Sequence, residues 1–292
     1  MPARREGDDP DRVVEVALAG PGDLDDARFT GLFEALARVD HPGLPRLHDV
    51  RIEGRLRVTV MERVDGWPLR SLLGRRELVL DAVRLGSLGH EVADTLRALH
   101  DAGRPFGVAH GRLGLTHVVV ERSGRLRVCG FPLPTHLAGV LPDAMGVGGI
   151  VAAAAVGMAP DPRGTTPAWL RGLAHTLERP ETAVRLPAGL RSLLCGLLAL
   201  HPEGFMPAMS VLSANFAAIA GRRAPSFAVA CGSSLHHATV GLVPGHRPTA
   251  HDAQHVVEAL ASQVTALAPY AAGSPPTESG AASAPRLRLS AG

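Results

Sequence analysis

The first 66 residues alternate between short apolar runs and one segment of helical periodicity. Residues 13–18 are rich in β-branched side chains and predict a strand. The next apolar positions recur at helical spacing after Asp25 or Asp26, either of which could cap the helix: Phe29, Leu32, Phe33, Leu36 and Val39. Prolines within 41–45 end this helix, because proline lacks an amide hydrogen and restricts the residue before it. Residues 47–52 and 56–61 then predict a hairpin that turns at Glu53-Gly54.

Helical periodicity dominates the rest of the chain. Residues 78–102 predict one long helix whose apolar face repeats every three or four positions: Leu85, Leu88, Val92, Leu96 and Leu99. A second hairpin is predicted from residues 118–121 and 126–129, which flank Ser123-Gly124. Four further helices are predicted, over 143–157, 167–177, 187–200 and 207–220. Past residue 221 we predict strands at 227–230 and 238–242 and an amphipathic helix at 251–268.

These patterns divide the chain into a small part that is mostly strand and a larger part that is mostly helix. The predicted organisation is a charged tail (1–11), the small part (12–66), the helical part (67–220), an extension (221–270) and a disordered tail (271–292). The last segment is dominated by Ser, Pro, Gly and Ala, which cannot bury enough apolar surface to fold. The fold class is therefore α+β.

The composition narrows the chemistry. All 30 basic residues are arginine, Asn215 is the single asparagine, and Gly and Pro number 33 and 24, which is typical of GC-rich, actinobacterial-like genomes. A mechanism that needs a lysine is excluded. The net charge of +2 gives no argument for a nucleic-acid partner. Three cysteines without C-x-x-C spacing fit a reducing cytoplasm, and the most apolar stretch, 145–159, is shorter than the ~20 residues of a membrane span.

Several local motifs resemble protein kinase motifs and occur in the kinase order. In the small part, residues 35–44 resemble a helix end with its His-Pro turn, and residues 54–66 resemble a strand that runs into the hinge. In the helical part, residues 96–103 with 110–113 resemble a helix that leads to the catalytic loop, and residues 124–133 resemble the strand before the Asp-Phe-Gly motif. Asp143 with Gly148 resembles the start of the following helix, and residues 200–207 resemble the turn between the last two helices. The resemblance covers residues 12–220 and is similar to the bacterial Ser/Thr kinase-like group. It implies a two-lobed fold with a hinge at 62–67, a truncated N-lobe without the glycine-rich loop, a helical C-lobe and a strand/helix extension.

The same resemblance implies that the catalytic groups have been lost. In the small lobe, Ala19 stands at the position of the strand lysine and Leu32 at that of its glutamate partner. In the catalytic loop, Arg112 stands at the position of the catalytic aspartate and Gly114 at that of the loop lysine. The magnesium-binding asparagine and aspartate positions hold His117 and Gly130. A guanidinium offers no acceptor for a substrate proton, and Mg²⁺ requires oxygen ligands. The resemblance therefore predicts a degenerate pseudokinase that is not an enzyme, needs no cofactor and does not bind ATP with Mg²⁺.

Other kinase positions keep their residue type. Leu36, His110 and Phe131 match the packing column that joins the two lobes, and Asp143 matches an anchor beneath the catalytic loop. The resemblance implies structural roles for these four residues. For Leu36 and Phe131, an ordinary place in the core explains the residue type equally well.

Two features near the C-terminus suggest contacts with a ligand or a partner. His251 and His255 are four positions apart and could share a metal on a helix, although solvent-facing histidines are the simpler interpretation. The same helix offers an apolar face as a possible partner contact: Val256, Val257, Leu260, Val264 and Leu267. The preferred hypothesis is a non-catalytic pseudokinase that serves as a scaffold or regulatory subunit for an unknown protein partner. The alternatives are a divergent nucleotide-binding enzyme of the same fold and a small-molecule or metal sensor.

Overall fold

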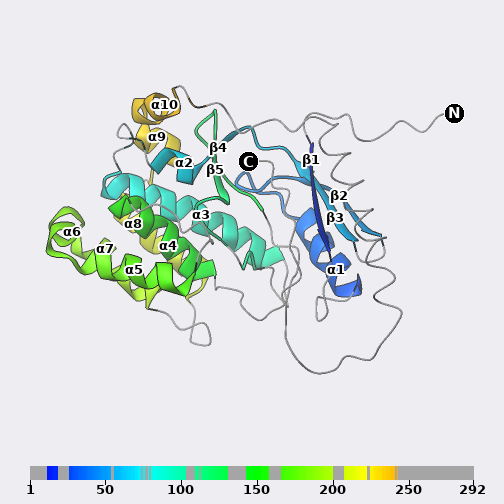
Figure 1. Cartoon of the computed structure of the whole chain (residues 1–292), viewed down its shortest axis with the longest axis horizontal. Helices are drawn as coiled ribbons and strands as arrows, with labels where there is room; N and C mark the ends of the chain where they lie inside the picture. Colours follow the sequence, from blue (N-terminus) through cyan, green and yellow to red (C-terminus); the bar gives the residue numbers. More distant parts are fainter. Residues whose placement is uncertain are drawn as a thin grey trace, which may run out of the picture.

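The computed structural model shows two lobes, a small one built on a sheet and a large helical one (Figure 1). It describes residues 12–18, 26–53, 56–73, 75, 78, 80–102, 109–111, 113–130, 143–157, 166–199, 207–221, 224–240 and 242. The predicted tails 1–11 and 271–292 and the predicted helix 251–268 lie outside the described residues. No helix in the described part of the chain is long and apolar enough to cross a membrane.

The small lobe is a three-stranded antiparallel sheet with one helix packed on it. Its elements are β1 (Arg12–Leu18), α1 (Asp26–Ala37), β2 (Leu47–Glu53) and β3 (Leu56–Glu62). The strand order is β1-β3-β2, so the last strand lies between the other two. Phe33 of α1 is buried, while Glu34 next to it is exposed. The four elements confirm the strands and the helix that the apolar pattern predicts.

A second small sheet connects the lobes. Its strands β4 (Gly66–Pro68), β5 (Val118–Glu121) and β6 (Leu126–Val128) pair in that order, all antiparallel. The sequence predicts the β5–β6 hairpin, but at residues 66–68 it predicts only the hinge region and no strand. Three residues are too few to show a strand period, and β4 forms because β5 supplies its partner. Residues 63–65 between β3 and β4 are the hinge.

The large lobe is built around one central helix. Its helices are α2 (Leu69–Leu73), α3 (Ala82–Ala102), α4 (Asp143–Val156), α5 (Pro167–Glu178), α6 (Pro180–Arg185), α7 (Ala188–Leu198) and α8 (Met209–Ala220). The long helix begins at Ala82, four residues after the predicted start, because the Asp81 carboxylate accepts the Arg84 N–H at 2.9 Å and caps it there. The short helices α2 and α6 are additions to the predicted set.

Small residues allow the helices of this lobe to approach closely. A Cβ at Gly89 of α3 would lie 2.5 Å from the ring of Phe216 on α8, so only glycine fits at this crossing. Helix α4 is buried on nearly every side from Asp143 to Ala154, which explains its almost exclusively Gly, Ala and Val composition. Such an all-round apolar helix is typical of the centre of a helical lobe.

The strands predicted after residue 221 are wrong, and this part of the extension is helical. Residues 227–230 lie in α9 (Phe227–Cys231), and the 238–242 segment begins inside α10 (Ser233–Thr239). The Ser226 hydroxyl accepts the Val229 N–H and so starts α9. Phe227 and Cys231, one helical turn apart, are both buried in the core. Packing of this one face against the lobe overrides the strand preference of a short apolar run.

Candidate functional site

A buried carboxylate organises the loop where a kinase would carry its catalytic aspartate. Asp143, the first residue of α4, is 4% exposed. Its Oδ2 accepts the backbone N–H of His110 at 2.8 Å, and its Oδ1 accepts that of Gly111 at 2.7 Å. The Nε2 of His100 on α3 donates to the same Oδ2 at 2.8 Å. Gly111 has φ 69°, a conformation that glycine adopts at little cost.

The charge of Asp143 is stabilised by these donors. Burial alone would raise the pKa of this carboxyl, but the hydrogen bond from His100, the nearby His110 and the Gly111 N–H outweigh it. The net effect lowers the pKa of Asp143. A deprotonated carboxylate is therefore part of the folded structure at neutral pH.

The ring of His110 connects the loop to the strand that follows it. The side chain is fully buried, and its Nε2 lies 3.1 Å from the carbonyl oxygen of Cys129. A carbonyl oxygen only accepts, so Nε2 carries the hydrogen. The Cys129 N–H in turn donates to the carbonyl oxygen of His117 at 2.7 Å. The loop and the end of β6 are thus fixed to one another.

The two positions at which the kinase resemblance predicts lost magnesium ligands, His117 and Gly130, are in direct contact. The ring of His117 packs beside Gly130, where an added Cβ would lie 2.7 Å from Cδ2 of the imidazole. The same ring makes an edge contact with His110, with centroids 5.1 Å apart. Gly130 has φ 70°. An imidazole and a bare backbone thus stand at the two positions where the kinase resemblance predicts that oxygen ligands for Mg²⁺ have been lost.

The remaining predicted site residues are partly described. Gly114 is buried and its carbonyl oxygen accepts the His117 N–H at 2.9 Å, while Leu36 is half-buried and packs on the core. Leu32 lies on α1. The other predicted positions lie outside the described residues: Ala19, Arg112, Phe131, His251, His255, Val256, Val257, Leu260, Val264 and Leu267. Among the described residues, no group of three or more His, Cys, Asp and Glu side chains could hold a metal.

A buried arginine between the lobes is the site feature that sequence reasoning missed. Arg127 on β6 places Nη2 2.5 Å from Oε2 of Glu62 and Nη1 3.5 Å from Oε1 of Glu121. Glu62 ends β3, so this contact joins the small lobe to the large one. The only signal in the sequence is a charged residue between two apolar ones in a three-residue strand. An arginine at such a position is more often solvent-exposed.

The carboxylate of Glu62 receives two donors. Besides Arg127, its Oε2 accepts the Arg46 N–H at 2.9 Å. Partial burial raises the pKa of Glu62, but this backbone hydrogen bond and the Arg127 charge outweigh it, so the pKa is lowered. Glu62 is therefore a charged member of the interface between the lobes.

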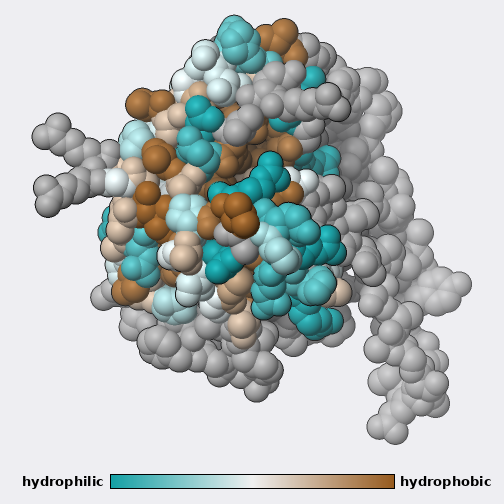
Figure 2. All heavy atoms as spheres, turned by 90° about the vertical axis from the view of Figure 1, so that its left-hand side faces the viewer, coloured by the Kyte–Doolittle hydropathy of each residue, from teal (hydrophilic) through white to brown (hydrophobic). Residues whose placement is uncertain are grey.

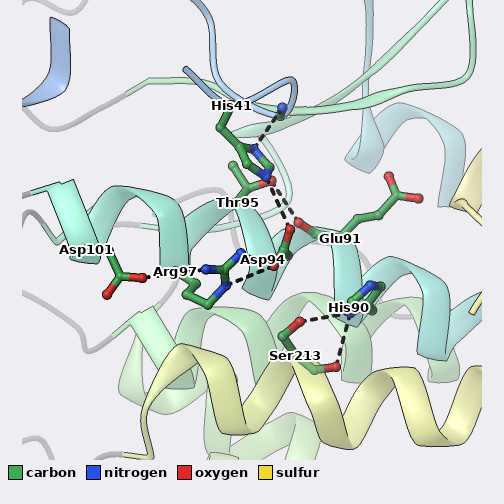
Figure 3. A network of polar contacts seen from close by, with 9 residues as sticks. His41, His90, Glu91, Asp94, Thr95, Arg97, Asp101 and Ser213 are labelled. Atoms are coloured by element: carbon green, nitrogen blue, oxygen red, sulfur yellow. Dashed lines mark hydrogen bonds and ion pairs between the residues drawn. The ribbon is translucent and has the colours of Figure 1, made fainter. Parts of the chain in front are cut away.

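The turn after α1 makes further polar contacts with the large lobe (Figure 3). His41 Nδ1 accepts the Gly43 N–H at 3.1 Å, so its Nε2 carries the hydrogen and donates to Asp94 of α3 at 3.2 Å. Arg97 Nη2 donates to the same carboxylate at 2.8 Å. The Gly43 carbonyl oxygen accepts the Val128 N–H of β6 at 2.8 Å. The predicted His-Pro turn is thus a docking point on the large lobe.

This architecture is that of a protein kinase: a three-stranded small lobe with one helix, a hinge, a loop held by a buried aspartate, and a helical large lobe. Solved kinase domains share it. The pseudokinase domain of BIR2, an immune regulator of the RLK/Pelle family, aligns with a TM-score of 0.55 and 17% identity over 75% of this chain and 76% of that one. The kinase domain of PknI from Mycobacterium tuberculosis aligns with a TM-score of 0.50 and 19% identity over 72% and 85%. The chain therefore has a protein kinase-like α+β fold.

Sequence comparison points the same way over a shorter stretch. The chain is 32% identical over 113 residues to the serine/threonine-protein kinase PkaA of Streptomyces coelicolor. The stretch is 39% of this chain and about a fifth (20%) of that protein's length. No family model matches the chain. The similarity supports a relationship with Ser/Thr kinases, and it leaves the activity of this chain to be argued from its own residues.

Proposed function

We propose that this chain is a non-catalytic pseudokinase that acts as a protein-binding scaffold or regulatory subunit. The observation that carries the proposal is the packing of His117 against Gly130. Phosphoryl transfer in kinases depends on metal ions that neutralise the phosphate charge and on a base that accepts the substrate proton. Both side-chain positions that would supply metal ligands lack an oxygen here, and an imidazole fills the space between them.

The composition adds an independent argument. The whole chain contains no lysine, so neither the strand lysine nor the loop lysine of a kinase has a counterpart. Arginine keeps a positive charge but is larger and planar, and it binds phosphate in a different geometry. Fold similarity does not decide the question, because one structural neighbour is described as a pseudokinase and the other as a kinase domain.

A scaffold role is favoured because the framework of the loop persists where the charged chemistry is gone. His110 and Asp143 still hold the loop in place although it carries no described catalytic carboxylate. The partner would be a protein of the cytoplasm. Figure 2 shows the end of the large lobe, where the described hydrophobic and hydrophilic residues are interleaved. The large hydrophobic residues that are exposed in the described part of the chain are all valines: Val83, Val184, Val211, Val229 and Val240.

Nucleotide binding is the direct test. The melting temperature of the purified chain would be measured with ATP or ADP, with and without Mg²⁺, beside an active kinase domain as the positive control. Ligand that binds only the folded state raises stability by about 2.7 kcal/mol at a hundredfold excess over Kd. We expect no shift for this chain and several degrees for the control. A Mg²⁺-dependent shift together with ATP turnover would support the divergent enzyme instead.

The scaffold half of the proposal needs a separate experiment. The full chain would be used to capture proteins from its native host, and a captured candidate would then be purified and titrated by calorimetry. We expect a stoichiometric complex that forms equally well with and without ATP. Elemental analysis of the purified chain tests the sensor alternative, since a bound metal at one equivalent would favour it.

A further inference from the structure

Two lobes joined by a three-residue hinge need non-covalent contacts to fix their orientation. Residues 63–65 form the hinge here. The turn after α1 gives one region of contact, through His41 with Asp94 and Gly43 with Val128. Both contacts come from one turn of the small lobe, so they restrict rotation about that turn less than translation. A second point of attachment, on another element of the small lobe, restrains the angle between the lobes further.

Arg127 supplies that second point. Its side chain is 6% exposed, whereas the side chains of its partners Glu62 and Glu121 are 37% and 21% exposed. Glu62 is anchored to the small lobe twice, as the last residue of β3 and through the Arg46 N–H. Glu121 ends β5 in the large lobe and keeps the guanidinium in position from that side.

Separating Glu62 from Arg127 costs free energy, and this cost restrains rotation of the lobes. A guanidinium does not lose its proton at any accessible pH, so Arg127 must remain paired or become solvated. A rotation that withdrew Glu62 would leave a buried charge with one carboxylate at 3.5 Å. Withdrawing one partner of a buried ion pair is strongly unfavourable for this reason. The ion pair between Arg122 and Asp65 at the hinge is different, because its side chains are 61% and 48% exposed and water can replace each partner.

We propose that Arg127 is an internal clamp that fixes the angle between the two lobes through Glu62, in the absence of any nucleotide. In this arrangement the chain presents one constant shape to a partner. The proposal goes beyond the proposed function and does not depend on it, since it concerns the ligand-free protein whatever that protein binds.

The clamp can be tested by measuring the distance between the lobes. Spin labels would be attached to Gly31→Cys on α1 and Arg171→Cys on α5, two exposed positions on opposite lobes, and distances read by pulsed electron–electron double resonance. The natural cysteines would first be replaced by serine or alanine: Cys129, Cys195 and Cys231. We expect one narrow distance distribution for the parent, at least a doubling of its width in Arg127→Met, and no change in the matched control Arg122→Met.

A parent-like distribution in a folded Arg127→Met variant would overturn the proposal. If that variant does not fold, Glu62→Met takes its place, since it removes the oxygen that accepts from both Arg127 and the Arg46 N–H. The same broadening is expected, and an unchanged distribution in Glu62→Met would equally refute the clamp. Adding ATP with Mg²⁺ to the Arg127→Met variant separates the two proposals: a distribution that narrows on addition would contradict the expectation that the chain does not bind ATP, and it would leave the clamp standing.

Discussion

Replacing Asp143 by asparagine tests the framework of the degenerate loop. The substitution keeps the side-chain volume, so it opens no cavity. It turns one acceptor oxygen into an NH₂ group, which can only donate. The groups that now donate to the two oxygens are the backbone N–H groups of Gly111 and His110 and the ring of His100. At least one buried N–H loses its acceptor.

The size of the effect follows from these contacts. A buried donor without a partner costs roughly 1–3 kcal/mol, with more when a charge is removed. We therefore expect Asp143→Asn to lower the free energy of unfolding by about 3 kcal/mol. The assay is urea denaturation at pH 7 followed by circular dichroism. The matched control is Asp101→Asn on α3, whose carboxylate is 44% exposed and lies 3.6 Å from Arg97; we expect it to change stability by less than about 1 kcal/mol.

The pH dependence of the same difference is a stricter check. The pKa of Asp143 is lowered in the folded state from an ordinary value of 3.8. A group with a depressed folded pKa contributes stability that is fully present above its unfolded value and is lost as the pH falls through the folded value. The gap in stability between the parent and Asp143→Asn should thus be constant above about pH 5 and shrink below about pH 4.

Two outcomes would refute this reasoning. A loss at pH 7 no larger than that of Asp101→Asn would show that the loop does not depend on the carboxylate. A gap that widened on acidification would mean that the folded pKa is raised, against the hydrogen bonds described above. The parent and both variants should unfold in urea in a single cooperative transition, because the comparison of free energies assumes a two-state transition.

Two further predictions concern glycines. Gly130→Asp, which would place a carboxylate at a predicted metal position, should destabilise the fold by about 2 kcal/mol because its Cβ overlaps the His117 ring and its backbone has φ 70°. The double variant with His117→Ala should regain the steric part of this loss in denaturant titrations, and equal losses in both would disprove the steric cause. Gly89→Ala should cost about 2 kcal/mol through its clash with Phe216, whereas Gly172→Ala on α5, with no heavy atom within 4 Å of the new Cβ, should stabilise by about 0.5–1 kcal/mol. Melting curves of the two alanine variants that moved in the same direction would contradict this assignment.

The elements with a long or regular apolar period could be read from the sequence. The three strands and the helix of the small lobe, the long helix α3 and the helix α4 all form where the periodicity places them. The helices of the extension could not be predicted from the sequence, since a run of five residues such as Phe227–Cys231 is too short for its apolar period to distinguish a helix from a strand. Its helical state depends on the core that receives Phe227 and Cys231.

The site divides in the same way. The kinase resemblance placed His117 and Gly130 at the metal positions, and residue type alone showed that no oxygen is available there. That the imidazole of one fills the space beside the other was decided by the loop geometry, because the two positions are 13 apart and meet only through the β5–β6 hairpin.

The amino-acid sequence by itself determined which side-chain types are absent: a chain without lysine has no lysine in any conformation. Only the tertiary structure decided which charges are buried together. Arg127 is one of 30 arginines, and only its place between two apolar residues distinguishes it locally from Arg122 and Arg125 in the same hairpin. Burial and ion pairing are properties of residues brought together from distant parts of the chain, here Glu62 and Arg127, and a local pattern contains no information on that distance.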